Sequence, residues 1–275
     1  MVQNKTTRAI FIHSAITYLH RHELDGISID WEYPTHRGTS IPEDKHRYTL
    51  LLKEFRQSIN QINNKTFTLS ASVSAGRKII NTAYQVTEIA KYVDWVNIMA
   101  YALHGAWKDK TGHHTAMEGG TPNVLDSLRT WQNLGMPNDK INLGLATYGR
   151  TFTLANPDKD GLGDRIIGAG LPGSYTGANG ILSYLEFCNK TWSRVTPFQK
   201  SIAKKPYASK GDQWIGYESP ESIFYEVKTV FAGNCCFRGI FIWTLGYDDF
   251  SGRFCQQGPF PLLKSAVKAL NDAHF

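Results

Sequence analysis

Two carboxylates near the end of a short apolar segment are the residues of this chain best suited to chemistry. Asp30 and Glu32 alternate with Ile29 and Trp31, so in a β-strand both acids lie on one face. Their Cα atoms would lie about 6.6 Å apart at the usual rise of a strand. Two partly desolvated carboxylates this close cannot both ionise freely. The pKa of one therefore rises, and that group can act as a general acid near neutral pH.

The segment that carries the acids, residues 24–34, predicts a strand that ends at a proline. Ser28 shares the face of Asp30 and Glu32, and apolar side chains fill the other face. A fully buried parallel strand would be apolar on both faces. A catalytic pair is therefore our first interpretation, and a solvated surface pair or a site for a hard cation is the alternative.

Helical and strand-like patterns alternate along most of the chain. Apolar periodicity predicts helices over residues 7–23, 45–62, 83–92, 124–134, 221–231 and 261–271. Ile10 would lie on the apolar face of the first helix. Strands are predicted over 67–73, 94–101, 141–148 and 239–245. This alternation indicates βα units around a parallel sheet. Residues 151–218 lack it and are rich in Gly, Pro and aromatic residues, so we expect a small α+β insertion there.

Composition is that of an ordinary globular chain. The 275 residues are 41% hydrophobic and 20% charged, and no apolar run reaches the roughly 18 residues of a membrane span. The net charge of +6 is spread out rather than interleaved with aromatics, so we expect neither nucleic acid nor a membrane as partner. The N-terminal residues have no signal-peptide core, which by itself favours the cytosol. Four cysteines fit no zinc motif, and we expect no metal and no cofactor.

The segment Asp25-Gly26-x-Ser28-x-Asp30-Trp31-Glu32-Tyr33-Pro34 resembles the fourth-strand signature of glycoside hydrolase family 18, the chitinases and chitinase-like lectins. Later motifs match those of the family in the same order: Met99-Ala-Tyr101-Ala102, His104-Gly-Ala-Trp107, Tyr148-Gly-Arg150, Trp243 and the segment 248–255. The resemblance implies an α/β fold, a (β/α)8 TIM-type barrel with an α+β insertion before the last strand.

About five βα units fit in this chain, whereas a closed barrel takes roughly 250 residues without insertions. The resemblance therefore implies a barrel that is incomplete at its N-terminus and has two open sheet edges. We expect strands four to seven in residues 1–150, the insertion in 151–218, and the last strand and helix in 219–275. A truncation would also account for the missing leader.

In this family the acid matching Glu32 is the proton donor, and the acid matching Asp30 holds the acetamido group of the substrate. The implied reaction is the substrate-assisted, retaining hydrolysis of β-1,4-linked N-acetylglucosamine polymers, in which the acetamido oxygen replaces a carboxylate nucleophile. Tyr101 completes the predicted catalytic set.

The predicted sugar contacts are Trp243, Met99, Tyr148, Arg150 and Trp107. Trp243 would form an aromatic floor under a sugar ring, although a core tryptophan is the alternative. Met99 and Tyr101 would alternate on one strand and face the same site. Tyr148 and Arg150 could bind sugar hydroxyls or simply pack at the boundary of the insertion, and Trp107 could add a stacking surface.

Two positions depart from the family pattern. Ser28 replaces an aspartate that shares a proton with its neighbour, so we expect Asp30 to stay ionised and the pH optimum to move. Ala102 replaces an aspartate that hydrogen-bonds the sugar at the scissile bond. Three hypotheses follow: a hydrolase of reduced activity, a chitinase-like lectin that binds without cleaving, and a non-functional partial barrel.

The resemblance also bears on cysteines and location. Cys188 and Cys255 match a family disulfide, whereas Cys235 and Cys236 have no counterpart. Asn-x-Thr sequons at residues 4, 64 and 189 would be glycosylated only in a secreted product. The resemblance therefore implies an extracellular monomer whose partner is chitin or a chito-oligosaccharide.

Overall fold

Parallel strands and helices alternate at the start of the chain, as the sequence predicts. The computed structural model describes residues 1–63, 65–232 and 236–273, so Asn64 and Cys235 lie outside the described residues. The chain divides into two units, each described by itself below. The first comprises Met1–Met99, Ser127–Leu143 and Phe237–Gly239, and the second comprises Ala100–Asp126, Gly144–Cys236 and Ile240–Phe275.

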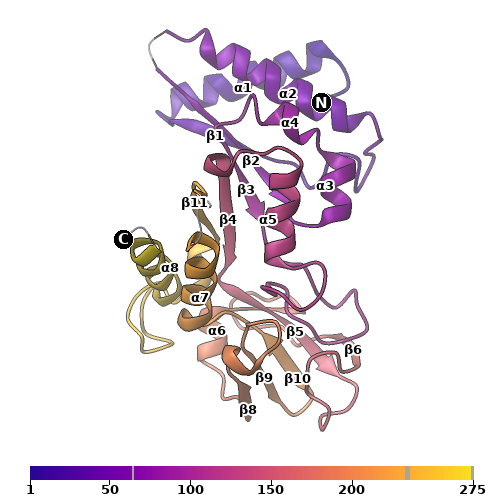
Figure 1. Ribbon diagram of the computed structural model, residues 1–275, viewed down its shortest axis with the longest axis vertical. Coiled ribbons are helices and arrows are strands. Elements are labelled where there is room, and N and C mark those ends of the chain that lie inside the picture. The colour runs from indigo at the N-terminus through magenta and orange to yellow at the C-terminus, as the bar shows by residue number, and fades with distance from the viewer. Residues whose placement is uncertain (64, 233–235, 274–275) are drawn as a thin grey trace. The chain divides into compact units, whose positions relative to one another are not determined.

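A five-stranded sheet contains the strand of the two acids. Its strands, in spatial order, are β1 (Gly26–Asp30), β2 (Thr68–Ser74), β3 (Trp95–Met99), β4 (Ile141–Ala146) and β11 (Gly239–Trp243). The β1–β2, β2–β3 and β3–β4 pairs are parallel (Figure 1). Among the described residues β1 and β11 end the sheet, so the expected open edges are present.

Five helices accompany these strands: α1 (Lys5–Arg21), α2 (Asp44–Asn60), α3 (Arg77–Ala83), α4 (Val86–Ile89) and α5 (Val124–Asn133). Only Val86–Ile89 of the predicted helix over 83–92 forms helix α4, because extended backbone at Tyr84 separates it from α3. Ile10 was predicted on the apolar face of α1 but is 65% exposed. Asn4 caps this helix, since its Oδ1 accepts a hydrogen bond from Thr7 N–H at 2.9 Å.

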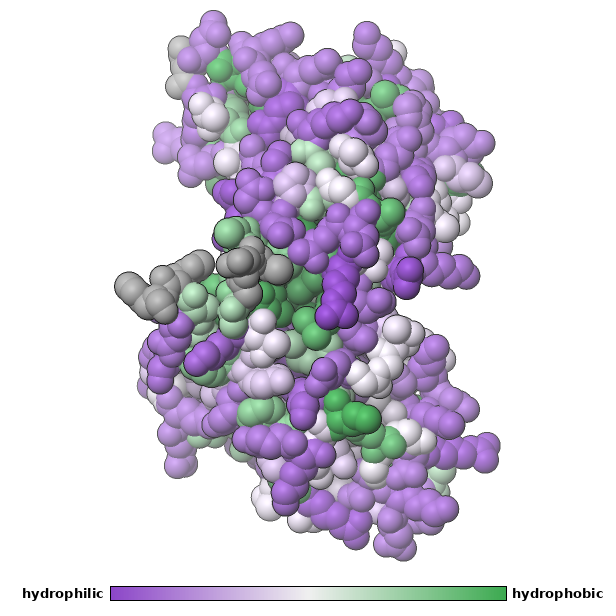
Figure 2. All heavy atoms as spheres, in the orientation of Figure 1, coloured by the Kyte–Doolittle hydropathy of each residue, from purple (hydrophilic) through white to green (hydrophobic). Residues whose placement is uncertain are grey.

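One face of the sheet in the first unit forms the hydrophobic core. Its buried side chains are Ile29, Leu69, Ala71, Val73, Val96, Ile98, Ile141 and Leu143. Helix α2 adds its stripe of Leu51, Phe55 and Ile59 to the core, and α1 packs beside α2 (Figure 1). Hydrophilic side chains cover most of the outer surface of α1 and α2 (Figure 2). This arrangement leaves the opposite face of the sheet free for polar residues.

The second unit contains an antiparallel sheet where the insertion was expected. Its strands are β5 (Tyr148–Leu154), β6 (Ile166–Ala169), β7 (Ile181–Ser183), β8 (Arg194–Thr196), β9 (Tyr207–Lys210) and β10 (Gln213–Gly216). The order is β6-β5-β10-β9-β8, and β7 also pairs with β5. The predicted strand over 141–148 is interrupted at Thr147, and the chain continues as β5 through Gly149 and Arg150.

The helices of the second unit are α6 (Tyr184–Cys188), α7 (Pro220–Phe231) and α8 (Pro261–Ala273). Short 3-10 helices occupy Asn138–Lys140 in the first unit, and Phe198–Lys200 and Leu245–Tyr247 in the second. Ser183 caps α6 through a reciprocal capping box with Glu186. No helix in the described part of the chain is long and apolar enough to cross a membrane.

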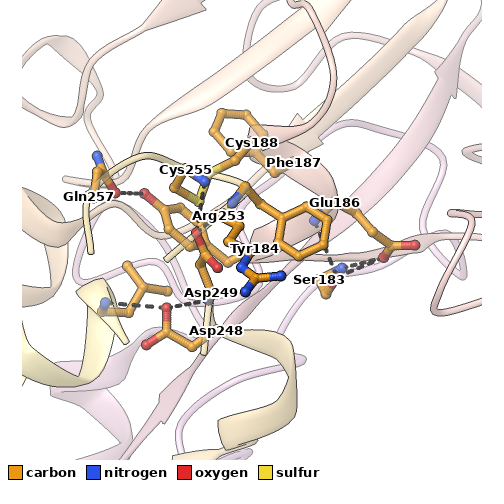
Figure 3. The surroundings of a disulfide bond; sticks show 12 residues. Ser183, Tyr184, Glu186, Phe187, Cys188, Asp248, Asp249, Arg253, Cys255 and Gln257 are labelled. Atoms are coloured by element: carbon orange, nitrogen blue, oxygen red, sulfur yellow. Dashed lines mark hydrogen bonds between the residues drawn. A yellow bond between two sulfur atoms is a disulfide. The ribbon is translucent and has the colours of Figure 1, made fainter. Parts of the chain in front are cut away.

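The disulfide between Cys188 and Cys255, implied by the resemblance, is confirmed. It joins the end of α6 to the loop after β11 and closes a separation of 67 residues (Figure 3). Asp249 holds the same loop, because its Oδ2 accepts hydrogen bonds from the backbone N–H groups of Phe254 and Cys255 at 3.0 and 2.8 Å. Cys236 is an exposed free thiol.

Candidate functional site

A polar row crosses the sheet of the first unit at the level of Asp30. In register, Asp30 pairs with Ser72, Ser72 with Asn97, and Asn97 with Asn142. Residues in register on parallel strands point to the same face. Asn142 donates a hydrogen bond from Nδ2 to Oδ1 of Asn97 at 3.0 Å, which fixes the middle of the row. The face opposite the apolar core therefore carries hydrogen-bonding groups on four adjacent strands.

Strand β2 supplies three serines to this polar face. Ser70, Ser72 and Ser74 alternate with Leu69, Ala71 and Val73, and of the serines only Ser72 is partly exposed. Ser70 pairs in register with Ser28, which lies two positions before Asp30 on β1. No role for these serines was predicted from the sequence. The signal was the alternation in residues 68–74, the same pattern that identified Asp30 and Glu32.

Asp30 faces away from the core, as predicted. The β1 pattern alternates from exposed Ser28 through buried Ile29 to exposed Asp30. Partial desolvation raises the pKa of Asp30 above its ordinary value. From the sequence, a raised carboxyl pKa was expected at the general acid and Asp30 was expected to stay ionised, so the raised pKa of Asp30, caused by burial, differs from that expectation.

Two buried tyrosines lie near enough to Asp30 for its charge to act on their hydroxyls. Tyr48 is fully buried beneath Trp31, with ring centroids 6.0 Å apart, and burial together with the charge of Asp30 raises the pKa of Tyr48. Tyr84 packs against Tyr48 at 5.8 Å, and burial also raises its pKa. These hydroxyls stay protonated and can only act as hydrogen-bonding groups near neutral pH.

Glu32 follows the end of β1 and is exposed. Its Oε2 lies 3.5 Å from Nη1 of Arg37, and the Arg37 guanidinium lies 5.6 Å from the centre of the Tyr33 ring. Burial, followed by the charge of Glu32, raises the pKa of Tyr33 to about 12. The ion pair is exposed, so it orients Glu32 more than it stabilises the fold.

Ser74 anchors the end of β2 next to this region. Its N–H donates to the Tyr84 hydroxyl at 3.2 Å, and its carbonyl accepts from Trp131 Nε1 at 2.9 Å. Its Oγ accepts from Gly76 N–H at 3.1 Å. Ser74 pairs in register with Met99, which is buried at the end of β3. The first unit therefore contains Asp30, Glu32 and Met99 of the predicted set.

The second unit contains the other predicted residues: Tyr101, Trp107, Tyr148, Arg150 and Trp243. Strand β3 ends at Met99, so the prediction that it extends to Tyr101 is wrong. The Tyr101 ring contacts the rings of Tyr148 and Phe241, with centroids 6.1 and 5.8 Å away. An aromatic cluster in the second unit therefore brings Tyr101 and Tyr148 together.

Arg150 links this cluster to the loop that carries Trp107. Its guanidinium lies 5.5 Å from the Trp107 ring centre and 5.8 Å from that of Tyr148. The Trp107 ring packs so closely over Gly105 that a Cβ there would meet it at 2.1 Å. Trp107 is nevertheless 60% exposed, which leaves aromatic surface available to a ligand.

Ala102 has a left-handed backbone, with φ 54°. This region favours Gly, Asn and Asp, so alanine is strained here. The N–H of Ala102 donates to Nδ1 of His114 at 3.3 Å, and Nε2 of His114 donates to the Tyr148 carbonyl at 3.0 Å. Buried His114 therefore joins the backbone after Tyr101 to β5, a positioning role that the sequence analysis missed.

Trp243 lies at the end of β11 and is 53% exposed, so it is not a core tryptophan. Its carbonyl accepts a hydrogen bond from Thr147 N–H at 3.1 Å, and Thr147 Oγ1 accepts one from Thr244 N–H at 3.0 Å. These bonds hold the backbone that carries the indole ring. Its exposure is compatible with an aromatic floor for a ring-shaped ligand.

The hard-cation interpretation of the acids gains no support. The described residues contain no group of three or more His, Cys, Asp and Glu side chains placed to hold a metal ion. Hydroxyls, aromatic rings and two exposed acids instead suit an uncharged ligand rich in hydroxyl groups.

Residues 1–248 match the model of glycosyl hydrolases family 18. The chain belongs to this family. Chitotriosidase-1 of Mus musculus is 34% identical over 283 residues, which cover 98% of this chain and 60% of that protein. The chain thus spans less than two thirds of this relative.

Solved structures of the family have the same fold. The Group IV chitinase of Ostrinia furnacalis in complex with allosamidin superposes with a TM-score of 0.93 at 32% identity, covering 99% of this chain and 75% of that chain. Human YKL-39, described as a pseudo-chitinase with retained chitooligosaccharide binding properties, superposes with a TM-score of 0.90 at 32% identity, covering 98% and 75%. The expected α/β barrel fold of family 18 is therefore confirmed, and the family includes active and inactive relatives.

Proposed function

We propose that this chain hydrolyses β-1,4-linked N-acetylglucosamine polymers, with Glu32 as the proton donor. The observation that carries the proposal is the polar end of β1. Asp30 and Glu32 lie outside the apolar core, and the pKa of Asp30 is raised by desolvation. Membership of family 18 and the match to an Ostrinia furnacalis chitinase support the assignment of chitin as substrate.

The proposed reaction needs no carboxylate nucleophile. Glu32 protonates the glycosidic oxygen while the substrate's acetamido oxygen attacks the anomeric carbon, so the leaving sugar departs as an alcohol. Asp30 accepts a hydrogen bond from the acetamido N–H and stabilises the resulting oxazolinium ion. Water then attacks the anomeric carbon and Glu32 takes its proton, which gives net retention of configuration. In this scheme Tyr101, Trp243, Met99, Tyr148, Arg150 and Trp107 bind the sugars.

Release of a fluorophore from 4-methylumbelliferyl chitobioside tests the proposal. Glu32→Gln should lower the rate by at least about 100-fold, because a positioned general acid contributes roughly 10²–10⁴-fold. Glu118→Gln, at an exposed acid of the second unit, is the matched control and should leave the rate unchanged. Cooperative melting of all three proteins must accompany the assay, because unfolded protein would also be inactive. Equal rates for Glu32→Gln and the unmodified chain would rule out the hydrolase.

A chitinase-like lectin is the second candidate. Ser28 and Ala102 favour it, because each replaces a family aspartate by a residue that carries no charge. Human YKL-39, described as a pseudo-chitinase, shows that the fold accommodates binding without hydrolysis. Calorimetric binding of chitotetraose, with no fluorophore release from the folded chain, would identify the lectin.

We also propose an extracellular location. The Cys188–Cys255 disulfide supports an oxidising compartment, since such bonds are rare in the cytosol. Relatives include oviduct-specific glycoproteins. Glycosylation at Asn4 or Asn189 after secretion, detected by a mass shift on glycosidase treatment, would test the location. An unmodified, intracellular product would contradict it.

A further inference from the structure

A cavity lies within the insertion of the second unit and has no part in the proposed hydrolysis. It has a volume of about 290 Å³, enough for a small organic molecule. Its walls come from β5, β7, β9 and β10 and from the segment after α6. None of its lining residues belongs to the predicted sugar site.

Two lysines give this cavity a positive charge. Lys190 and Lys210 both line it, and no carboxylate is among its lining residues. In the described part of the chain, neither lysine forms an ion pair. Two uncompensated ammonium groups at one concave site favour an anion.

Thr151 provides an independent indication of a ligand. This residue lines the cavity and is only 3% exposed, yet its Oγ1 has no hydrogen-bond partner within the described residues. Buried hydroxyls nearly always find a partner, so each exception requires an explanation. Solvent does not reach this hydroxyl in the structure, so rotation of the Thr151 side chain toward the cavity would let a polar atom of a bound molecule satisfy it.

The rest of the cavity suits a ring. Leu182, Trp192 and Trp214 line it together with exposed Leu171. The Trp192 indole is held rigidly, because it stacks on Phe187 at 5.6 Å and donates from Nε1 to the Phe187 carbonyl at 3.1 Å. The next residue after Phe187 is Cys188, whose disulfide anchors this wall (Figure 3). The ligand would therefore meet a preformed apolar surface beside the two cations.

We propose that this cavity binds a small organic anion, with a single sulfonate, sulfate or carboxylate group on an apolar ring. The lysines would hold the anionic group, Thr151 would hydrogen-bond to the ligand, and the leucines and tryptophans would enclose the ring. The site is separate from the proposed chitin chemistry, so its test does not depend on hydrolysis.

Titration calorimetry with 2-naphthalenesulfonate tests the proposal. We expect saturable one-to-one binding, with at least tenfold weaker affinity for Lys190→Ala/Lys210→Ala. The matched control is Lys108→Ala/Lys159→Ala, which removes two exposed lysines of the second unit outside the cavity and should leave the affinity unchanged. Thr151→Val keeps the shape of the side chain and should also weaken binding.

Four results would overturn the inference. Neutral 2-naphthol binding as tightly as the sulfonate would show that charge has no role. Inorganic sulfate binding as tightly would show that the apolar walls have none. Displacement of the sulfonate by chitotetraose would place the binding at the sugar site. Binding that survives the Lys190/Lys210 double substitution would also contradict the assignment.

Discussion

Asp30 on β1 stands directly opposite Ser72 on β2, so the acid has a hydroxyl-bearing residue, not another carboxylate, as its cross-strand partner. Its neighbour two positions back on the same face, Ser28, is also a serine, and Ser28 faces Ser70. The pKa of Asp30 is raised by desolvation alone. The polar end of β1 therefore carries two exposed acids, with serines rather than a third carboxylate beside Asp30.

Ser28→Asp should raise the hydrolysis rate and shift its pH profile. Ser28 is exposed, so a carboxylate fits without entering the core. A second negative charge beside Asp30 raises the pKa of one member of the pair and lets the two share a proton. The assay is fluorophore release from the chitobioside between pH 4 and 8. Ser14→Asp on the exposed surface of α1 is the control. An unchanged rate and profile for Ser28→Asp would refute this account.

Ala102→Asp should increase hydrolysis by roughly two- to tenfold, the equivalent of one hydrogen bond of about 0.5–1.5 kcal/mol. The left-handed φ of 54° at this position suits aspartate better than alanine, so the substitution should not strain the backbone. Ala102→Gly separates the two effects. Glycine relieves the same backbone strain without an acceptor, so it should raise the melting temperature and leave the rate unchanged. Equal rates for the Asp and Gly variants would exclude a role for the acceptor.

Glu226→Gln should remove a pH dependence of stability. Lys205, Glu218 and Glu226 are buried together, and the Lys205 ammonium bonds both carboxylates. One cation cannot neutralise two anions, and burial raises the pKa of Glu226 to about 7. A carboxyl whose pKa is higher in the folded than in the unfolded chain stabilises the fold most at pH values below the unfolded pKa, near 4.5. This stabilisation is lost as the pH rises to 7.

Denaturant unfolding at several pH values measures this effect. Between pH 4.5 and 7, the free energy of unfolding of the unmodified chain should fall by up to about 1.4 kcal/mol per pH unit relative to that of Glu226→Gln. Above pH 7 the difference should be constant. The free energy of unfolding of Glu118→Gln should change with pH as that of the unmodified chain does. The same pH dependence for Glu226→Gln would disprove the charge imbalance.

His113→Phe should stabilise the chain, most of all in acid. His113 is buried, neither ring nitrogen has a hydrogen-bond partner in the described residues, and desolvation with nearby Lys205 lowers its pKa to about 3. The unfolded chain takes up a proton near pH 6.5 and the native chain does not, so stability is lost as pH falls below 6.5. Phenylalanine keeps the contacts with the Tyr207 and Trp214 rings.

Denaturant titrations measure the increase in the free energy of unfolding that His113→Phe produces. As the pH falls from 6.5 to 5, this increase should grow by up to about 1.4 kcal/mol per pH unit. His13→Phe, on the exposed surface of α1, should show no such growth. A gain of equal size at pH 7.5 and pH 5 would mean that packing alone stabilises the variant.

Local alternation made β1 predictable, because a period of two is visible in the sequence itself. The disulfide and the order of the motifs came from the resemblance. The break at Tyr84 and the continuation of β5 through Arg150 depend on tertiary pairing, which local periodicity does not encode. The same holds for the cavity lined by Lys190 and Lys210, which lie 20 positions apart and line one cavity only in the folded chain.

The strict alternation along β1 and β2 also has an evolutionary consequence. Each side chain belongs either to the packed core or to the polar face, so replacing Ser28 removes no core volume and creates no void. Substitution of exposed Ser28 therefore costs little to folding, whereas Ser70 and Ser74 on the same face are buried. A lineage with this sheet can drift between cleaving and merely retaining its ligand while the scaffold stays under separate selection.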